Sequence, residues 1–228
     1  MARQSRWLTV LGSIVVVFCV FGIYKAVHAT DIALRGGTHE FNRLFDYPLW
    51  AIIHFAAAGL FMTMLPFQIW AGFRERHRTL HRKSGRVMFI AGLGISATGL
   101  FLPFSMPARP LSERIFMVTI SLLFGLFLIQ AVAAARKGDF VSHREWMLRA
   151  VAGVSGAMLQ RLMFPLFPMV LGIHSLTEFW KYFVTSNWLS TAIVLGTAEW
   201  WIRSGSHHIL DPHAKSDGRV NGPLSEIP

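Results

Sequence analysis

Long apolar runs alternate with short polar segments along this chain. A helix needs about 20 predominantly apolar residues to cross the hydrocarbon core of a bilayer, and the runs are close to this length. The pattern predicts an all-α protein, a bundle of six transmembrane helices. The predicted runs are Trp7–Ile23, Leu49–Phe73, Val87–Ser105, Ile115–Ala135, Phe140–Pro168 and Asn187–Ile202.

The two ends of the chain are predicted to differ in structure. We expect the first run to be retained as a transmembrane helix, with a signal peptide cleaved after Ala29 as the alternative. Beyond Arg203 the chain is mainly Gly, Ser, Pro and charged residues, with little to bury. Such a segment is predicted to be a flexible cytoplasmic tail. The expected domains are therefore a six-helix membrane domain over 1–204 and a tail over 205–228.

The composition is typical of a membrane protein. The 228 residues are 53% hydrophobic, with a mean hydropathy of +0.45, yet the formal net charge is +10. In a soluble protein this excess would suggest nucleic acid as the partner. Here the cations lie in short segments between apolar runs, a distribution that orients membrane helices and attracts anionic lipid. We therefore expect a lipid bilayer, and no nucleic acid, as the partner.

The basic residues also predict the orientation. With the N-terminus inside, fifteen Lys and Arg residues fall in inside segments and six in outside segments, and the remaining one lies within a run. The positive-inside rule favours this arrangement over its inverse. We predict both termini in the cytoplasm and a location in the inner (plasma) membrane. The outside cations are Lys25, Arg35, Arg43, Arg109, Arg114 and Lys181.

Arg161 is the basic residue that lies deep inside the fifth run. It follows His143 by eighteen residues, about five helical turns, so both share a helix face. A cation at this depth costs about 3 kcal/mol on insertion and normally faces the bundle interior with a partner. Pro165 also frees the carbonyl of Arg161. We predict an inward-facing arginine that could bind a haem propionate, a lipid phosphate or a small anionic ligand.

This topology places polar side chains in two groups, one near the outer surface of the membrane and one near the inner surface. His54 lies near the outer surface, within reach of the long Arg161 side chain. For His54 three roles stay open: a hydrogen-bonded structural residue, an axial haem ligand or a proton relay. For Glu199 the expected partner is Arg203, one turn further on. The inner polar group consists of Gln68, Gln130, His81, His143 and Glu199.

Local signals predict packing and exclude several chemistries. Ser84 is the expected N-cap of the third run, and the small residues around Gly92 and Gly99 predict a close helix–helix seam. His77 and His81 have metal-pair spacing, but their cationic surroundings disfavour a metal, so no metal site is expected. The chain has no phosphate loop, nucleophile elbow, HExxH or CxxC motif, and enzymatic activity stays undecided.

Two motifs carry a family resemblance: HRKSGR at 81–86 and HREWMLR at 143–149, with His54 and Gln68 before them and Arg161 after. Together they resemble uncharacterised bacterial multi-pass proteins grouped as a predicted-membrane-protein domain of unknown function, over residues 45–205. A looser similarity is to di-haem b-type membrane cytochromes, which hold four histidine ligands in four helices. The third and fourth runs here contain no histidine, so a single haem would need a further ligand, such as His174 or a methionine.

These residues lead to three functional hypotheses. The first is a redox membrane protein that binds b-type haem, with His54, His81 and His143 as candidate ligands and Arg161 neutralising a propionate. The alternative is a transporter-like protein that handles a small solute or lipid, in which Arg161 binds an anion and His54 relays protons. The third is a non-catalytic membrane scaffold or assembly factor whose histidines form interhelical hydrogen bonds.

Overall fold

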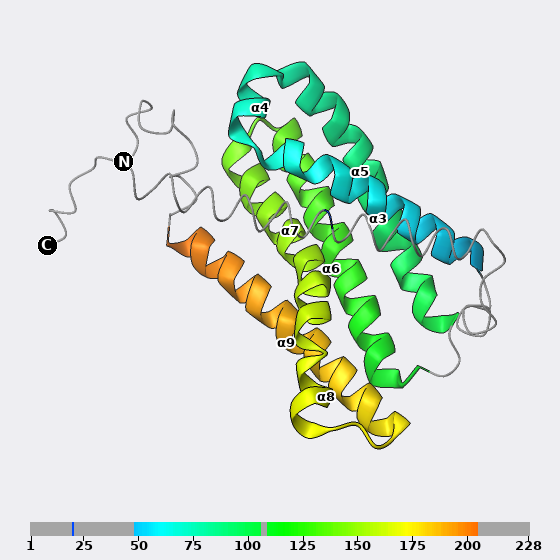
Figure 1. Cartoon of the computed structure of the whole chain (residues 1–228). Coiled ribbons are helices and arrows are strands. Elements are labelled where there is room, and N and C mark those ends of the chain that lie inside the picture. Colours follow the sequence, from blue (N-terminus) through cyan, green and yellow to red (C-terminus); the bar gives the residue numbers. More distant parts are fainter. Residues whose placement is uncertain (1–19, 21–47, 106–108, 205–228) are drawn as a thin grey trace, which may run out of the picture.

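The computed structural model describes residues 20, 48–105 and 109–204, and the structural statements below concern these residues. Apart from residue 20, the predicted first run and the predicted tail lie outside them. The described part contains helices and no strand, which confirms the all-α prediction (Figure 1). The elements are α3 (Pro48–Ile69), α4 (Ala71–Arg76), α5 (Arg78–Phe101), the 3-10 helix η1 (Leu102–Phe104), α6 (Leu111–Arg136), α7 (Phe140–Met163), α8 (Leu166–Leu171) and α9 (Leu176–Arg203).

Four described segments are long and apolar enough to cross a membrane. They correspond to the second, third, fourth and fifth predicted runs; α9, which contains the sixth, is not among them. Many apolar side chains on these helices are exposed, up to 80% for Met169 and 79% for Val170 in α8. Such surfaces are stable only against lipid or another apolar partner. The four segments are Leu49–Ile69, Arg78–Phe104, Leu111–Arg136 and Phe140–Leu171.

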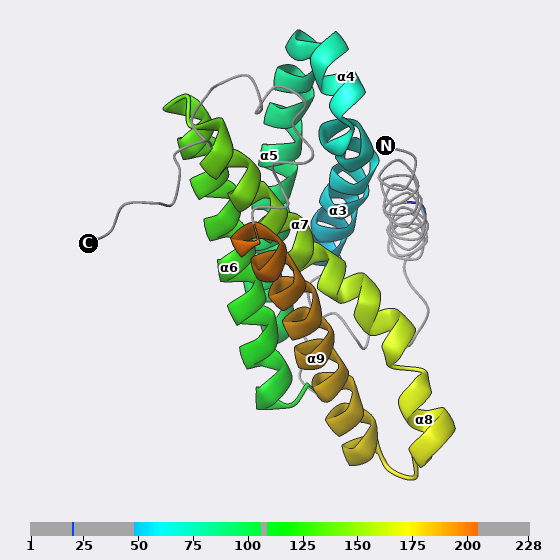
Figure 2. The same ribbon diagram turned by 90° about the vertical axis from the view of Figure 1, so that its left-hand side faces the viewer.

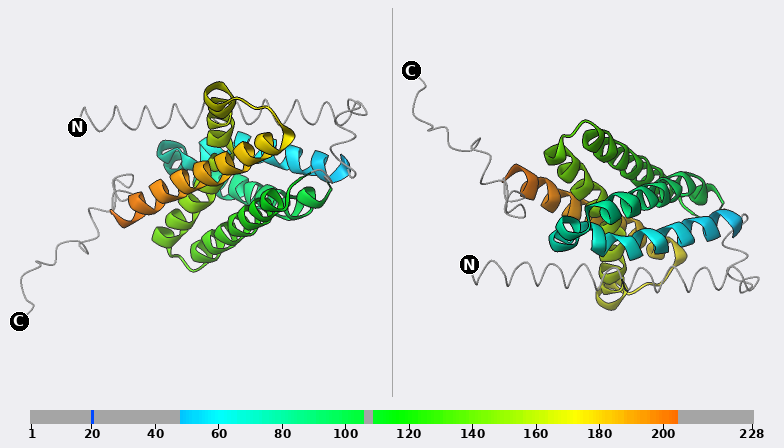
Figure 3. Two further views of the ribbon diagram at one scale, coloured as in Figure 1. Left: turned by 90° about the horizontal axis from the view of Figure 1, so that it is seen from below. Right: turned by 90° about the horizontal axis from the view of Figure 1, so that it is seen from above.

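Helices that follow one another along the chain pack side by side. The order of neighbours is α3, α5, α6, α7 and α9 (Figures 1 and 2). An apolar core joins the first four, where Phe61 meets Phe124 edge to face at 5.6 Å between ring centroids. Seen along the bundle, α9 runs obliquely to the other helices and its C-terminal end extends past them (Figure 3).

The contact between α7 and α9 differs from this apolar core. On the α9 side Ser186, Asn187 and Ser190 are buried, and on the α7 side Gly156 and Gln160 are buried. The Gln160 amide donates to the Ser186 hydroxyl at 3.4 Å. Small and weakly polar residues let two helix backbones approach closely, as in other membrane helix pairs.

Helices α5 and α9 begin well before the positions that the hydropathy pattern predicts. Helix α5 begins at Arg78, so Ser84 lies within the helix and is not its N-cap; its hydroxyl donates to the Leu80 carbonyl at 2.7 Å. The charged residues before the apolar run are good helix formers and extend the helix beyond the predicted membrane depth. Helix α9 begins at Leu176 instead of Asn187, because Ser175 caps it by accepting from the Glu178 N–H.

The glycine seam of α5 is confirmed. A methyl group at Gly92 would meet Leu128 and Phe61, and one at Gly99 would meet Ser121. Proline also acts as predicted in the fifth run, where α7 ends at Met163, α8 begins at Leu166 and Pro165 lies between them.

Gly156→Ala is expected to weaken the α7–α9 contact. Its methyl group would lie 2.8 Å from Thr191 Oγ1 and 3.2 Å from Thr191 Cα, a backbone atom that cannot move aside. We expect the free energy of unfolding to fall by about 1–3 kcal/mol. The control is Gly196→Ala, where nothing lies within 4 Å of the new methyl group. Unfolding of both purified variants in detergent tests the prediction, and equal losses would contradict it.

Candidate functional site

Two of the predicted site histidines come together at one end of the bundle. His81 lies in the first turns of α5 and His143 in the first turn of α7, and the two rings interact electrostatically. This end also carries α4 and the turn between α6 and α7 (Figures 1 and 2). We call it the basic end, because Arg74 and Arg82 also act electrostatically on His81.

The ring orientation of His143 is fixed by a backbone carbonyl of α6. Its Nδ1 lies 2.8 Å from the carbonyl oxygen of Ala131. A carbonyl can only accept, so Nδ1 carries the hydrogen and donates it. In the neutral ring, Nε2 then keeps its lone pair and can accept a proton or bind a metal.

In contrast to His143, His81 has a Nδ1 that makes no hydrogen bond to any described residue. This nitrogen is buried. Leaving a buried polar atom unpaired costs about 1–3 kcal/mol, so such an atom calls for an explanation. A bound group that contacts this nitrogen would explain why it has no partner within the protein.

Gln68 joins α3 to this end of α5. Its amide nitrogen donates to the Ser84 hydroxyl at 2.7 Å and approaches the His81 carbonyl at 3.4 Å. Gly85 makes the approach possible, since a Cβ there would lie 3.3 Å from the Gln68 Oε1. Gln68 therefore contacts the part of α5 that carries His81.

His54 lies apart from this pair. It precedes Gln68 by fourteen residues on α3, about 21 Å along the helix axis. Its Nδ1 is 2.9 Å from the Thr98 hydroxyl, whose own hydrogen goes to the Gly94 carbonyl at 2.6 Å. The single hydroxyl hydrogen is thereby used, so His54 donates from Nδ1 and its Nε2 keeps the lone pair.

Arg161 takes a different orientation from the one expected. Its side chain is exposed on the described bundle instead of facing the interior, and its Nη1 donates to the Ala157 carbonyl of its own helix at 2.7 Å. The helix itself thus supplies an acceptor for one of the five N–H donors of the guanidinium. The proximity to His54 agrees with the sequence analysis, because the two groups interact electrostatically.

Glu199 and Gln130 are not part of the His81–His143 group. The Glu199 carboxylate binds Arg149 of α7 through two contacts, at 2.5 and 3.2 Å. Arg203, the expected partner, is further away at 4.0 Å. The correction follows from the close α7–α9 packing, which the sequence pattern does not reveal. Gln130 is exposed on α6.

The sequence analysis missed a buried ion pair at the opposite end. Glu113 is 1% exposed in the first turn of α6 and binds Arg109, one turn earlier. Its Oε2 has no hydrogen-bond partner among the described residues. The i, i+4 spacing of the two charges could have indicated the pair, but α6 begins at Leu111, earlier than the predicted apolar run.

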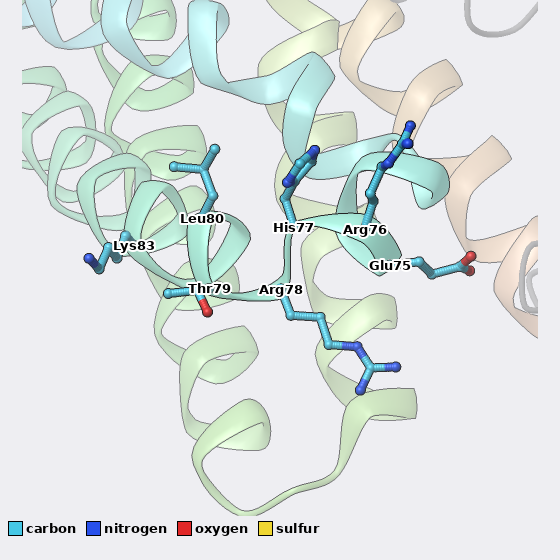
Figure 4. A pocket seen from close by; sticks show the side chains of 7 residues that line it. All are labelled: Glu75, Arg76, His77, Arg78, Thr79, Leu80 and Lys83. Atoms are coloured by element: carbon cyan, nitrogen blue, oxygen red, sulfur yellow. The ribbon is translucent and has the colours of Figure 1, made fainter.

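No metal-ligand cluster occurs among the described residues. His, Cys, Asp and Glu side chains do not gather in groups of three or more in that part of the chain. His77, which has metal-pair spacing to His81, lies at the break between α4 and α5. Figure 4 shows the side chains around His77 pointing in different directions instead of toward a common centre.

A comparison with known protein families gives a match. The model of a family described as predicted membrane protein (DUF2306) matches residues 51–202, which is more than half of the chain. The chain belongs to the DUF2306 family. The multi-pass membrane prediction is thereby confirmed, and the family description names no activity. No curated protein and no solved structure matches this DUF2306 chain.

The second motif of this DUF2306 chain, HREWMLR, organises the start of α7. His143 binds the Ala131 carbonyl of α6, and Met147 packs against the apolar core. Arg149 lies over the Trp146 ring at 4.6 Å and binds Glu199 of α9. The motif therefore connects α7 to both of its neighbours.

The Arg149–Glu199 pair is expected to be energetically coupled, whereas Arg203 is not essential to it. In a double-mutant cycle of Arg149→Gln and Glu199→Gln, the two losses in unfolding free energy should be non-additive by up to about 1 kcal/mol, the range for a partly exposed pair. Arg203→Gln serves as the control and should change stability by less than about 0.5 kcal/mol. A larger effect of Arg203→Gln than of Arg149→Gln would contradict this pairing.

Proposed function

We propose that this membrane protein binds a b-type haem at the basic end, with His81 and His143 as axial ligands, and acts in electron transfer. The observation that carries the proposal is the interacting pair of imidazoles supplied by α5 and α7. Haem, when bound, supplies one-electron redox chemistry. The residues of the chain supply ligation, orientation and charge.

The orientation of His143 fits this role. A ligating histidine usually donates its other ring N–H to a carbonyl or carboxylate, which fixes the tautomer and strengthens the ligand. The Nδ1 of His143 makes this bond to Ala131, an entirely buried residue. The carbonyl therefore holds the ring while Nε2 stays available.

The surroundings of His81 fit the same group. Its buried Nδ1 has no partner among the described residues, and ligation through this nitrogen would give it one. The guanidinium groups of Arg74 and Arg82, which act on His81, are suited to bind carboxylates such as propionates. The same charges disfavour a bare divalent cation, so a porphyrin with anionic side groups fits better.

His54 and Arg161 form a second candidate element for this function. His54 also donates from Nδ1, to Thr98, and keeps Nε2 available. The Arg161 guanidinium is near enough to interact with it and would neutralise a propionate at that end. We therefore retain His54 as a candidate ligand for a separate site.

We also propose the topology that this function requires. The basic end lies in the cytoplasm, six helices cross the inner membrane, and both termini are cytoplasmic. The support is the grouping of cations at one end, from α4, the start of α5 and the α6–α7 turn, as the positive-inside rule expects.

Visible spectra of the purified full-length protein test the haem proposal. After haem-replete expression we expect a Soret band, and bands that change reversibly between the oxidised and reduced forms. His143→Ala and His81→Ala should each remove or shift these bands, because each deletes a ligand.

The matched control is His77→Ala, an exposed histidine four residues before His81. It should leave the spectra unchanged, and a thermal unfolding measurement verifies that each variant is folded. A folded wild-type protein without a Soret band would exclude the proposal. Equal spectral loss in all three variants would exclude this ligand pair.

A further inference from the structure

The basic end presents cations that form no ion pair in the described part of the chain. Six exposed side chains define what we call the basic surface: Arg76, Arg78, Arg82, Lys83, Arg136 and Lys137. None of them forms an ion pair within the described residues. Glu75 and Asp139 are the acidic residues in the same two segments. The surface therefore carries a strong positive excess.

Exposed apolar side chains lie among these cations. Trp70, at the break before α4, is 66% exposed, and Leu80 in α5 and Phe140 at the start of α7 are also exposed. Tryptophan is enriched at the depth of lipid headgroups, where one side of the ring meets lipid and the other meets water. Cations and apolar anchors at one level are the combination found at membrane interfaces.

The cations do not converge on one point. The recess at the α4–α5 break is open, and Figure 4 shows Arg76, Arg78 and Lys83 extending in different directions around it. A single small anion would require several donors directed at one position. Divergent cations instead suit several phosphates spread over a surface.

We propose that the basic surface binds the anionic phospholipid headgroups of the leaflet at which the basic end lies. The arginine and lysine side chains contact phosphates of neighbouring lipids, while Trp70, Leu80 and Phe140 insert beside them. Each basic side chain near an anionic membrane surface strengthens the attraction about fivefold. The binding is independent of haem and would persist in a protein without it.

Lipid binding to the full-length protein in a neutral detergent tests the proposal. Phosphatidylglycerol or phosphatidylcholine is titrated in, and bound lipid is counted by native mass spectrometry. We expect phosphatidylglycerol to bind more tightly, and added salt to weaken only its binding. Lys83→Gln should reduce its affinity about fivefold, and Arg78→Gln/Arg82→Gln about 25-fold, if the effects of the two charges multiply.

Lys181→Gln is the matched control, because Lys181 is an exposed lysine on α9 without an ion pair among the described residues. It should leave the phosphatidylglycerol affinity unchanged, and Lys83→Arg should retain it. Equal affinity for the two lipids, or equal effects of Lys83→Gln and Lys181→Gln, would overturn the proposal. Displacement of the lipid by inorganic phosphate beyond the effect of sodium chloride at the same ionic strength would also overturn it, because the surface would then be a site for free phosphate.

Discussion

The structure depends on one constraint: a polar group inside a bilayer has to find its hydrogen-bond partner within the protein. The backbone satisfies this by forming helices. Many polar side chains satisfy it in the same way, by donating to the carbonyl four residues earlier in their own helix. The donors that follow this pattern are Thr63, Ser84, Thr98, Arg144, Arg161, Thr185 and Thr197.

Other polar side chains connect different helices. In the described bundle each pair of neighbouring long helices has at least one such bond, so these contacts follow the packing order. They are weak individually, but they specify which helix lies beside which, a role that apolar contacts in lipid fulfil poorly. The pairs are His54–Thr98 and Gln68–Ser84 between α3 and α5, Ser96–Ser121 between α5 and α6, His143–Ala131 between α6 and α7, and Arg149–Glu199 and Gln160–Ser186 between α7 and α9.

The sequence predicted those features that depend on residue type alone. Hydropathy located four of the long helices, small residues located the seam at Gly92, and the motifs located the histidines of the basic end. Helix ends were predicted less well, because hydropathy marks only the apolar part of a helix. Charged residues that favour helices, such as those that follow Arg78, continue the helix outside the membrane. The partner of Glu199 depends on the distance between α7 and α9, which no local pattern contains.

The central claim is that the basic end faces the cytoplasm and the opposite end, with Lys181, faces outward. Cysteine labelling tests it most directly, in a Cys19→Ser background that removes the native thiol. A membrane-impermeant maleimide should label Lys181→Cys in intact cells, and Lys83→Cys only after the cells are permeabilised. Labelling of both positions from the same side, or of Lys83→Cys in intact cells, would contradict this account.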